Sequence, residues 1–143
     1  LVGSEMCIRD RAKKRIYIFD GWQSLELTNL DIAEKLKPQI VHEPIFCDSA
    51  EPKSIAELQI DGIDARPVKK GKNSVLHGIQ WLQQHELIVD SKNQELINEL
   101  NTYQWKKDKD GNSLPIPCGA DHSIDAIRYA TEIEHAGFFE GLI

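Results

Sequence analysis

Two groups of residues in this chain have the side chains and spacing that metal-dependent or acid–base chemistry requires. Asp48 directly follows the apolar run PIFC and precedes small residues, which is how a buried strand ends when it presents a side chain at the carboxyl edge of a sheet. Asp121, His122 and Asp125 stand together in DHSIDAIRYA, where positions three and four apart share one face of a helix. Carboxylate oxygens and an imidazole nitrogen on such converging elements would suit Mg²⁺ or Mn²⁺ better than zinc.

Each group also has a purely structural interpretation, and the residue types alone leave both open. Asp48 would then cap the helix that follows it. Asp121 would be the N-cap of its own helix, Asp125 would interact favourably with the dipole of the first turn, and His122 would simply be exposed. Arg128, one turn beyond Asp125, would either neutralise a carboxylate or face solvent.

The elements that must position these residues alternate between strands and helices. Polar and apolar residues alternate at 14–20 and predict a strand, and Thr28 with Asp31 predicts a helix start resembling a capping box. Ala126, Ala130 and Ile133 are expected to form the buried face of the last helix. Further strands are predicted at 64–68, at 87–89 and within 44–50, where the strand stops at Asp48. Further helices begin near Pro52, Val75, Ser91 and Asp121, and residues 106–112 predict a hairpin or loop tip. The alternation favours the α/β class.

The composition sets limits on what the chain can be. Its 143 residues and 41% hydrophobic content suit one ordinary domain with a core. No apolar run approaches the roughly 20 residues that a membrane span needs. The net charge of −6 disfavours a domain whose main role is non-specific attraction to phosphate, yet it is compatible with a nuclease whose carboxylates hold metal ions. Cys7, Cys47 and Cys118 form no pair of CxxC motifs for zinc, and we interpret them as reduced thiols of an intracellular protein.

Lysines form two local positive patches. Lys69, Lys70 and Lys72 would either contact DNA phosphates, which positions a duplex without reading its sequence, or be solvated loop residues. For the second patch, within 106–109, the solvated loop tip is the favoured interpretation. The aromatic residues Trp81, Tyr103 and Trp105 are interpreted as core or core-edge residues in preference to platforms for base stacking.

Four linked motifs resemble one protein family. CDSAEPKSIAEL (47–58), KGKNSVLHGIQWLQ (70–83), LNTYQWKKDKDGN (100–112) and DHSIDAIRYA (121–130) are similar, in order and spacing, to the C-terminal nuclease domain of bacteriophage terminase large subunits. The similarity is greatest to the group found in prophages of Gram-positive bacteria, and KRIYIFD and LTNLDIAEKL also fit that family.

The resemblance implies a ribonuclease H-like fold, a mixed sheet flanked by helices, and a metal-dependent endonuclease that cuts concatemeric viral DNA. It implies a two-metal site for Mg²⁺ or Mn²⁺ with Asp48, Asp125 and His122 as catalytic and metal-binding residues; Asp121 stands where the family often has Asn. The implied partners are double-stranded viral DNA, the terminase small subunit, the portal protein and an upstream ATPase domain in the same chain, with no membrane. The implied location is the cytoplasm of the infected or lysogenic bacterial host.

One departure from the family concerns the start of the chain. The string SEMCIRDR is similar to translated sequencing-adapter read-through, and residues 1–11 show no strand period, so we expect 1–11 to be non-native and 12–143 to be a partial nuclease domain. The family's first strand and its catalytic Asp would then be missing, because Asp20 follows the second strand. Two alternatives stay open at this point: a non-catalytic RNase H-like module for DNA binding or assembly, and another RNase H-like nuclease such as a resolvase or transposase.

Overall fold

The strands and helices of the chain alternate much as the sequence predicts. The computed structural model describes residues 2–40 and 42–132. The strands in that part are β1 (Val2–Asp10), β2 (Arg15–Ser24), β3 (Ile45–Cys47), β4 (Ala65–Pro67), β5 (Glu86–Val89), β6 (Gln104–Lys107) and β7 (Ser113–Cys118). The helices there are α1 (Asn29–Leu36), α2 (Pro52–Ile60), α3 (Ser74–Leu82), α4 (Gln94–Thr102) and α5 (His122–Ala130). The α/β class is therefore confirmed.

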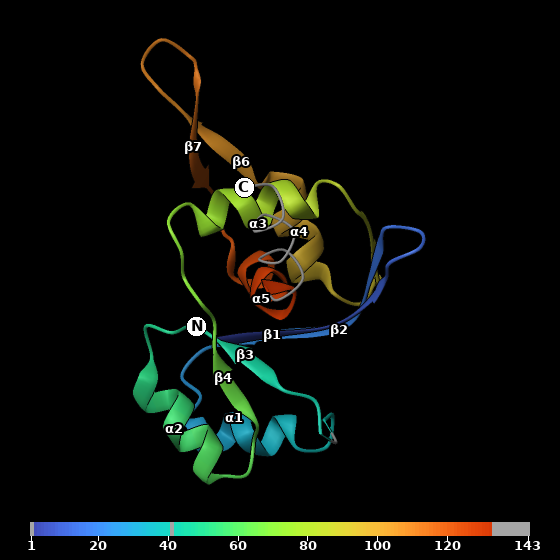
Figure 1. Cartoon of the computed structure of the whole chain (residues 1–143), viewed down its shortest axis with the longest axis vertical. Coiled ribbons are helices and arrows are strands. Elements are labelled where there is room, and N and C mark those ends of the chain that lie inside the picture. The colour runs from blue at the N-terminus through green and yellow to red at the C-terminus, as the bar shows by residue number, and fades with distance from the viewer. Residues whose placement is uncertain (1, 41, 133–143) are drawn as a thin grey trace.

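The strands form one mixed sheet and two separate pairs. β2 lies in the middle of the mixed sheet, antiparallel to β1 and parallel to β5. β3 and β4 form a parallel pair of their own. β6 and β7 form an antiparallel hairpin that projects away from the rest of the molecule (Figure 1). Within the described residues, β1 and β3 are each paired on one side only.

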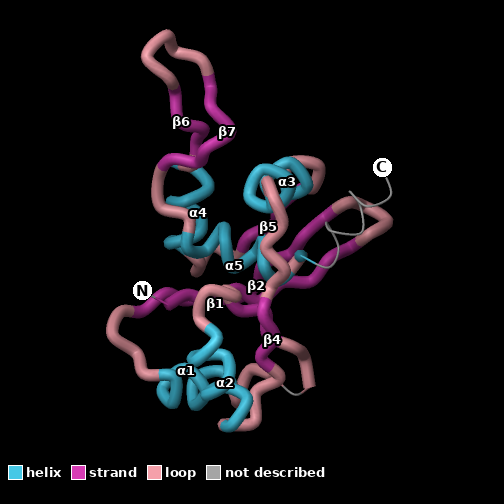
Figure 2. Tube along the Cα trace, turned by 60° about the vertical axis from the view of Figure 1, so that its left-hand side comes forward, coloured by secondary structure: helices cyan, strands magenta, loops and turns pink. Residues whose placement is uncertain are grey.

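Two hydrophobic cores lie on opposite sides of the β1–β2 ribbon. On one side are α3, α4 and α5, and on the other are α1 and α2 with the β3–β4 pair (Figures 1 and 2). The first core is built around Ile16 and Ile18 of β2 together with Trp81, which is only 1% exposed. Tyr103 and Trp105 pack at its edge, so the interpretation of the three aromatic residues as core or core-edge residues is confirmed. The second core joins apolar residues of α1, α2 and β4.

The N-terminal segment differs from the prediction. Residues 2–10 were expected to show no strand, yet they form β1 and pair along the whole of β2, from Val2 opposite Ser24 to Asp10 opposite Arg15. The strand was missed because backbone hydrogen bonds between strands can form without an alternating pattern of polar and apolar side chains. A bulge between Met6 and Cys7 also shifts the register of the pairing. β2 is correspondingly longer than the strand predicted at 14–20.

The helix starts follow side-chain capping where the sequence offered it. Thr28 caps α1 in a full capping box with Asp31, as predicted. The start of α4 was predicted at Ser91, which was wrong, because Asn93 is the N-cap and its side chain accepts a hydrogen bond from the backbone N–H of Leu96 at 3.2 Å. The second helix does begin at Pro52.

The buried face of α5 also differs from the prediction. Ile124 and Ile127 are the apolar residues of this helix that reach the core, whereas Ala126 and Ala130 are half-buried. Ile133 lies outside the described residues. The two alanines instead line a cavity of about 680 Å³ between α5 and the second core. The face of α5 that carries Ala126 and Ala130 therefore borders a cavity and is not fully buried, although its residues follow the helical period.

This cavity is lined mainly by apolar side chains from both sides of the molecule. Phe19 and Trp22 of β2, Leu36 of α1 and Ile45 of β3 contribute to it, as does Cys7 of β1. β1 and β3, which are each paired on one side only in the described part of the chain, therefore both border the same cavity.

In the described part of the chain, no helix combines the length and the apolar character needed to cross a bilayer.

Candidate active site

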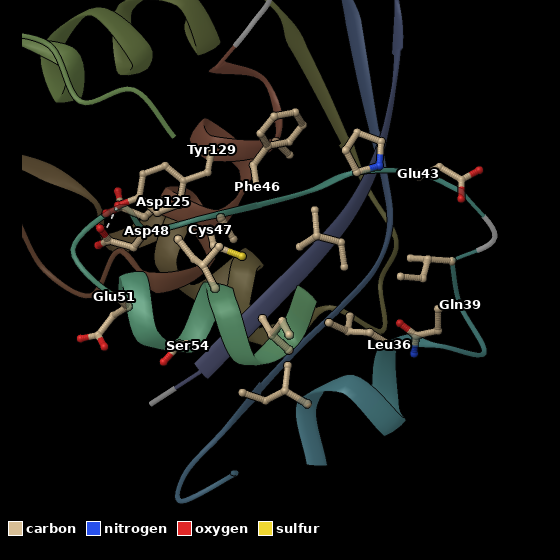
Figure 3. Close-up of a pocket in the computed structure, with 18 of the residues that line it drawn as sticks. Leu36, Gln39, Glu43, Phe46, Cys47, Asp48, Glu51, Ser54, Asp125 and Tyr129 are labelled. Atoms are coloured by element: carbon tan, nitrogen blue, oxygen red, sulfur yellow. Dashed lines mark hydrogen bonds between the residues drawn. The ribbon is translucent and has the colours of Figure 1, made fainter. Parts of the chain in front are cut away.

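Asp48 directly follows β3 and lies at the end of the cavity where Asp125 and Tyr129 also lie, which we call the polar end (Figure 3). Its Oδ1 accepts a hydrogen bond from the backbone N–H of Ala50 at 2.8 Å and forms an ion pair with the ammonium group of Lys70. The hydroxyl of Tyr129 donates to Oδ2 at 3.4 Å. Asp48 therefore does not cap α2, whose N-cap residue, Glu51, makes no side-chain capping bond. Instead its carboxylate links the end of β3 to Lys70, in the loop before α3, and to Tyr129 of α5.

The surroundings keep Asp48 ionised. Partial burial acts to raise the pKa of this carboxyl, but the hydrogen bonds from Lys70, Ala50 and Tyr129 and the charge of Lys70 outweigh it, so the pKa is lowered. The contact with Asp48 raises the pKa of Lys70 in turn. Burial raises the pKa of Tyr129, and the charges of Asp125 and Asp48 add to that effect. Tyr129 is thus a neutral hydrogen-bond donor that lies between two carboxylates.

Asp125 is held by a buried arginine on the same helix. Arg128 donates from Nε and Nη2 to Oδ1 of Asp125 at 3.0 and 2.7 Å, and its side chain is only 5% exposed, against 29% for Asp125. The sequence left open whether Arg128 neutralises a carboxylate, and the structure shows that it does. Gly78 of α3 makes room for it, since a Cβ there would lie 2.9 Å from Cδ of Arg128.

The first turn of α5 is capped from another helix. Asp121 occupies the N-cap position, but its side chain makes no capping bond. Glu99 of α4 accepts hydrogen bonds from the backbone N–H groups of Ser123 and Ile124 at 2.9 and 3.1 Å, with Oε2 as the acceptor. His122, the first residue of α5, is exposed, as the structural interpretation expected.

The structure brings together some of the predicted site residues and separates others. Asp48, Asp125 and His122 all border the cavity, and Figure 3 shows the two carboxylates grouped beside Tyr129. Asp121 does not line the cavity. Among the residues that the structure describes, no three His, Cys, Asp or Glu side chains stand close enough to hold a metal ion. The carboxylate oxygens and the imidazole nitrogen have the right chemistry for Mg²⁺ or Mn²⁺, but in the part of the chain that the structure describes fewer than three such side chains lie together.

The three lysines of the predicted DNA-binding loop differ in their contacts. Lys69, Lys70 and Lys72 are all exposed in the loop that joins β4 to α3, and Lys70 is the member that pairs with a site carboxylate. The lysines within 106–109 are exposed along the β6–β7 hairpin. Both loops leave their lysines accessible to an anionic partner.

Two residues of the site were not singled out by the sequence analysis. Tyr129 lies one turn after Asp125, so its position on the same helical face was a usable signal. Glu99 lies three residues after Leu96, on the buried side of α4. A glutamate at such a position indicates a hydrogen-bonding partner, because buried carboxylates need one. Neither signal indicates which group the residue contacts, because the partners are 81 and 24 positions away in the chain.

Replacement of Gly78 by Ala is expected to destabilise the domain by about 1 kcal/mol. Overpacking against the fixed Arg128 side chain costs about 2 kcal/mol, and the better helix propensity of Ala recovers about 1 kcal/mol. Urea unfolding would measure the difference. The matched control is Gly71→Ala, because a Cβ at Gly71 meets nothing within 4 Å. Equal stability of the two variants would contradict the close packing of Arg128.

Comparison with known proteins now identifies the family. The family model described as "Terminase RNAseH like domain" matches residues 6–133. The chain belongs to this family. It is 33% identical over 134 residues to the large subunit of terminase from Bacillus phage SPP1, a match that covers 86% of the chain and 31% of that protein. The terminase domain described here thus spans less than a third of the curated relative.

A solved structure shares the fold. The terminase domain matches the crystal structure of the g2p (large terminase) nuclease domain from bacteriophage SPP1 with bound Mn, with a TM-score of 0.86 and 29% identity. The match covers 92% of this chain and 78% of that one. The predicted ribonuclease H-like fold is therefore confirmed. The family match also favours a terminase over a resolvase or transposase, and it begins at residue 6, within the segment 1–11.

Proposed function

We propose that this chain is part of a divalent-metal-dependent DNA endonuclease, the nuclease domain of a phage terminase large subunit. The observation that carries the proposal is the convergence of Asp48 from β3 and Asp125 from α5 at one end of the cavity. Support comes from the family and from a relative with 29% identity whose solved nuclease domain has Mn bound. Bound Mg²⁺ or Mn²⁺ would activate water and stabilise the leaving oxygen of a phosphodiester, which is the two-metal chemistry expected of such a site.

The residues of this chain would have distinct roles in that site. Asp48 and Asp125 would be the metal-binding carboxylates, with one oxygen of Asp125 fixed by Arg128 and the other left for a ligand. His122 is exposed at the start of α5, where its imidazole would bind a second ion or accept a proton at a ring nitrogen. Asp121 would have at most an outer role, because it does not border the cavity.

The missing part of the ligand set would come from a further strand. β1 and β3 both border the cavity and each has an unpaired side, so an apolar strand seated there would join the two sheets and cover Ala126 and Ala130. A carboxylate at its end would complete the site beside Asp48. If residues 1–11 are non-native, the native residues in their place would have to form β1 as well as this further strand, and the upstream reading frame of the source sequence tests that part.

The substrate would be double-stranded viral DNA, cut from a concatemer during packaging. Lys69, Lys70 and Lys72 would contact its phosphates at the edge of the site. An upstream ATPase domain, the terminase small subunit and the portal protein would be the partners, and the host cytoplasm would be the place of action. The family supports each of these assignments.

A plasmid-nicking assay with Mn²⁺ tests the proposal. The proteins compared would be this chain and an extended protein, which is the chain with its native upstream residues in place of 1–11. The extended protein is expected to nick DNA and to lose that activity with EDTA, whereas this chain is expected to be on the order of 100-fold less active, because the carboxylate proposed on the further strand would be absent from its site. An extended protein that is inactive, or active without metal, would favour a non-catalytic module or a different chemistry.

A further inference from the structure

Asp48 and Asp125 each form an ion pair with a basic side chain of the protein itself, and the two basic side chains differ in how firmly they are held. Arg128 donates two hydrogen bonds to Asp125. Its side chain is 5% exposed and packs against Gly78 of α3. Lys70 is 42% exposed at the end of a flexible side chain and contacts Asp48, which is 41% exposed. The guanidinium is therefore a fixed part of the site, whereas the ammonium group is free to exchange with solvent ions.

The position of Lys70 is the one that a metal ion would need. Its ammonium group contacts Oδ1 of Asp48, and the remaining oxygen, Oδ2, faces the hydroxyl of Tyr129 at 3.4 Å. A divalent cation on this carboxylate would lie within a few ångströms of the ammonium group, and the like charges would repel. Lys70 must then leave Asp48, and its place in the exposed loop between β4 and α3 allows it to swing outward.

We propose that Lys70 is a displaceable counterion that occupies the Asp48 carboxylate in the metal-free domain and is released when a divalent cation binds. The inference rests on the proposed metal site. Once released, the ammonium group would be available to a DNA phosphate at the same edge, with Lys69 and Lys72 beside it. Metal binding and phosphate binding would thus be coupled, because one lysine serves both carboxylate and phosphate. Lys70 is a positioning residue in this scheme.

The experiment is a titration of the extended protein and of its variants with Mn²⁺, followed by the electron paramagnetic resonance signal of the free ion; the unmodified chain in this comparison is the extended protein without a substitution. Lys70→Gln is expected to bind Mn²⁺ about fivefold more tightly than the unmodified chain, because the competing cation is gone. Lys70→Arg retains the competitor and is expected to bind as the unmodified chain does. Lys72→Gln removes the same charge from the same loop without touching Asp48, so the difference between the two Gln variants isolates the contact.

The outcomes separate this inference from the proposed function. Equal affinities for Lys70→Gln and Lys72→Gln, or weaker binding by Lys70→Gln, would overturn the role of Lys70 while leaving the metal site intact. If Lys70 only stabilised the structure around Asp48, Lys70→Gln would bind Mn²⁺ more weakly than the unmodified chain. Absence of Mn²⁺ binding in every protein, or binding by Lys70→Gln that survives an added Asp48→Asn, would overturn the metal site at Asp48 and the Lys70 proposal with it.

Discussion

Replacement of Asp48 by Asn is expected to lower Mn²⁺-dependent nicking by the extended protein on the order of 100-fold or more. The amide keeps the shape of the side chain but removes the negative charge that would hold the ion. The fold should tolerate the change, since the pair with Lys70 is 42% and 41% exposed and such pairs contribute about 0–1 kcal/mol to stability. Nicking rates and urea unfolding of the same preparations would measure the two effects separately.

Asp64→Asn is the matched control for this prediction. Asp64 is also an exposed aspartate paired with a basic side chain, Arg66, at 2.7 Å, but it does not line the cavity. The control variant should retain full nicking activity and a similar small change in stability. Nicking by Asp48→Asn at the rate of the control would show that Asp48 binds no essential metal ion. The site would then have to be sought elsewhere in the domain.

Replacement of Glu99 by Ala is expected to lower the free energy of unfolding of this chain by about 3 kcal/mol or more. Glu99 is 5% exposed, and its carboxylate accepts from Ser123 N, Ile124 N and, at 2.7 Å, from Nε2 of Gln23. Ala leaves the two buried backbone N–H groups at the start of α5 without an acceptor. Gln restores one acceptor but lacks the charge that favours a helix N-terminus, so a loss of about 1 kcal/mol is expected. Urea unfolding would measure both.

Glu95→Ala provides the comparison for Glu99, because Glu95 lies on the same helix and is exposed. Its loss should change stability by about 0.5 kcal/mol or less. If Glu99→Ala were no less stable than Glu95→Ala, the cap on α5 would be unimportant. Because His122 and Asp125 both lie in the first turn of α5, loss of the cap should also disorder the polar end of the cavity, which amide hydrogen exchange in α5 would detect.

Local signals accounted for most of the elements of the fold. Thr28 and Asp31 specified the start of α1 because a capping box uses only neighbouring residues, and alternation along residues 14–20 identified β2. β1 was missed because its strand is formed by backbone pairing with β2, without an alternating side-chain pattern of its own. The buried face of α5 was misassigned because the period of a helix does not indicate which face meets a core and which meets a cavity.

The sequence by itself determined the α/β alternation, the positions of Asp48 and Asp125 at the ends of their elements, and the motifs that carry the family resemblance. Only the tertiary structure decided that Lys70 contacts Asp48, that Arg128 is buried against Asp125, and that Glu99 rather than Asp121 caps α5. The physical reason is distance along the chain, which for Arg128 is the distance to Gly78 of α3, against which its side chain packs. Capping and periodicity are local, whereas the contacts of Lys70 and Glu99 join residues that are more than 20 positions apart, and only packing brings these together.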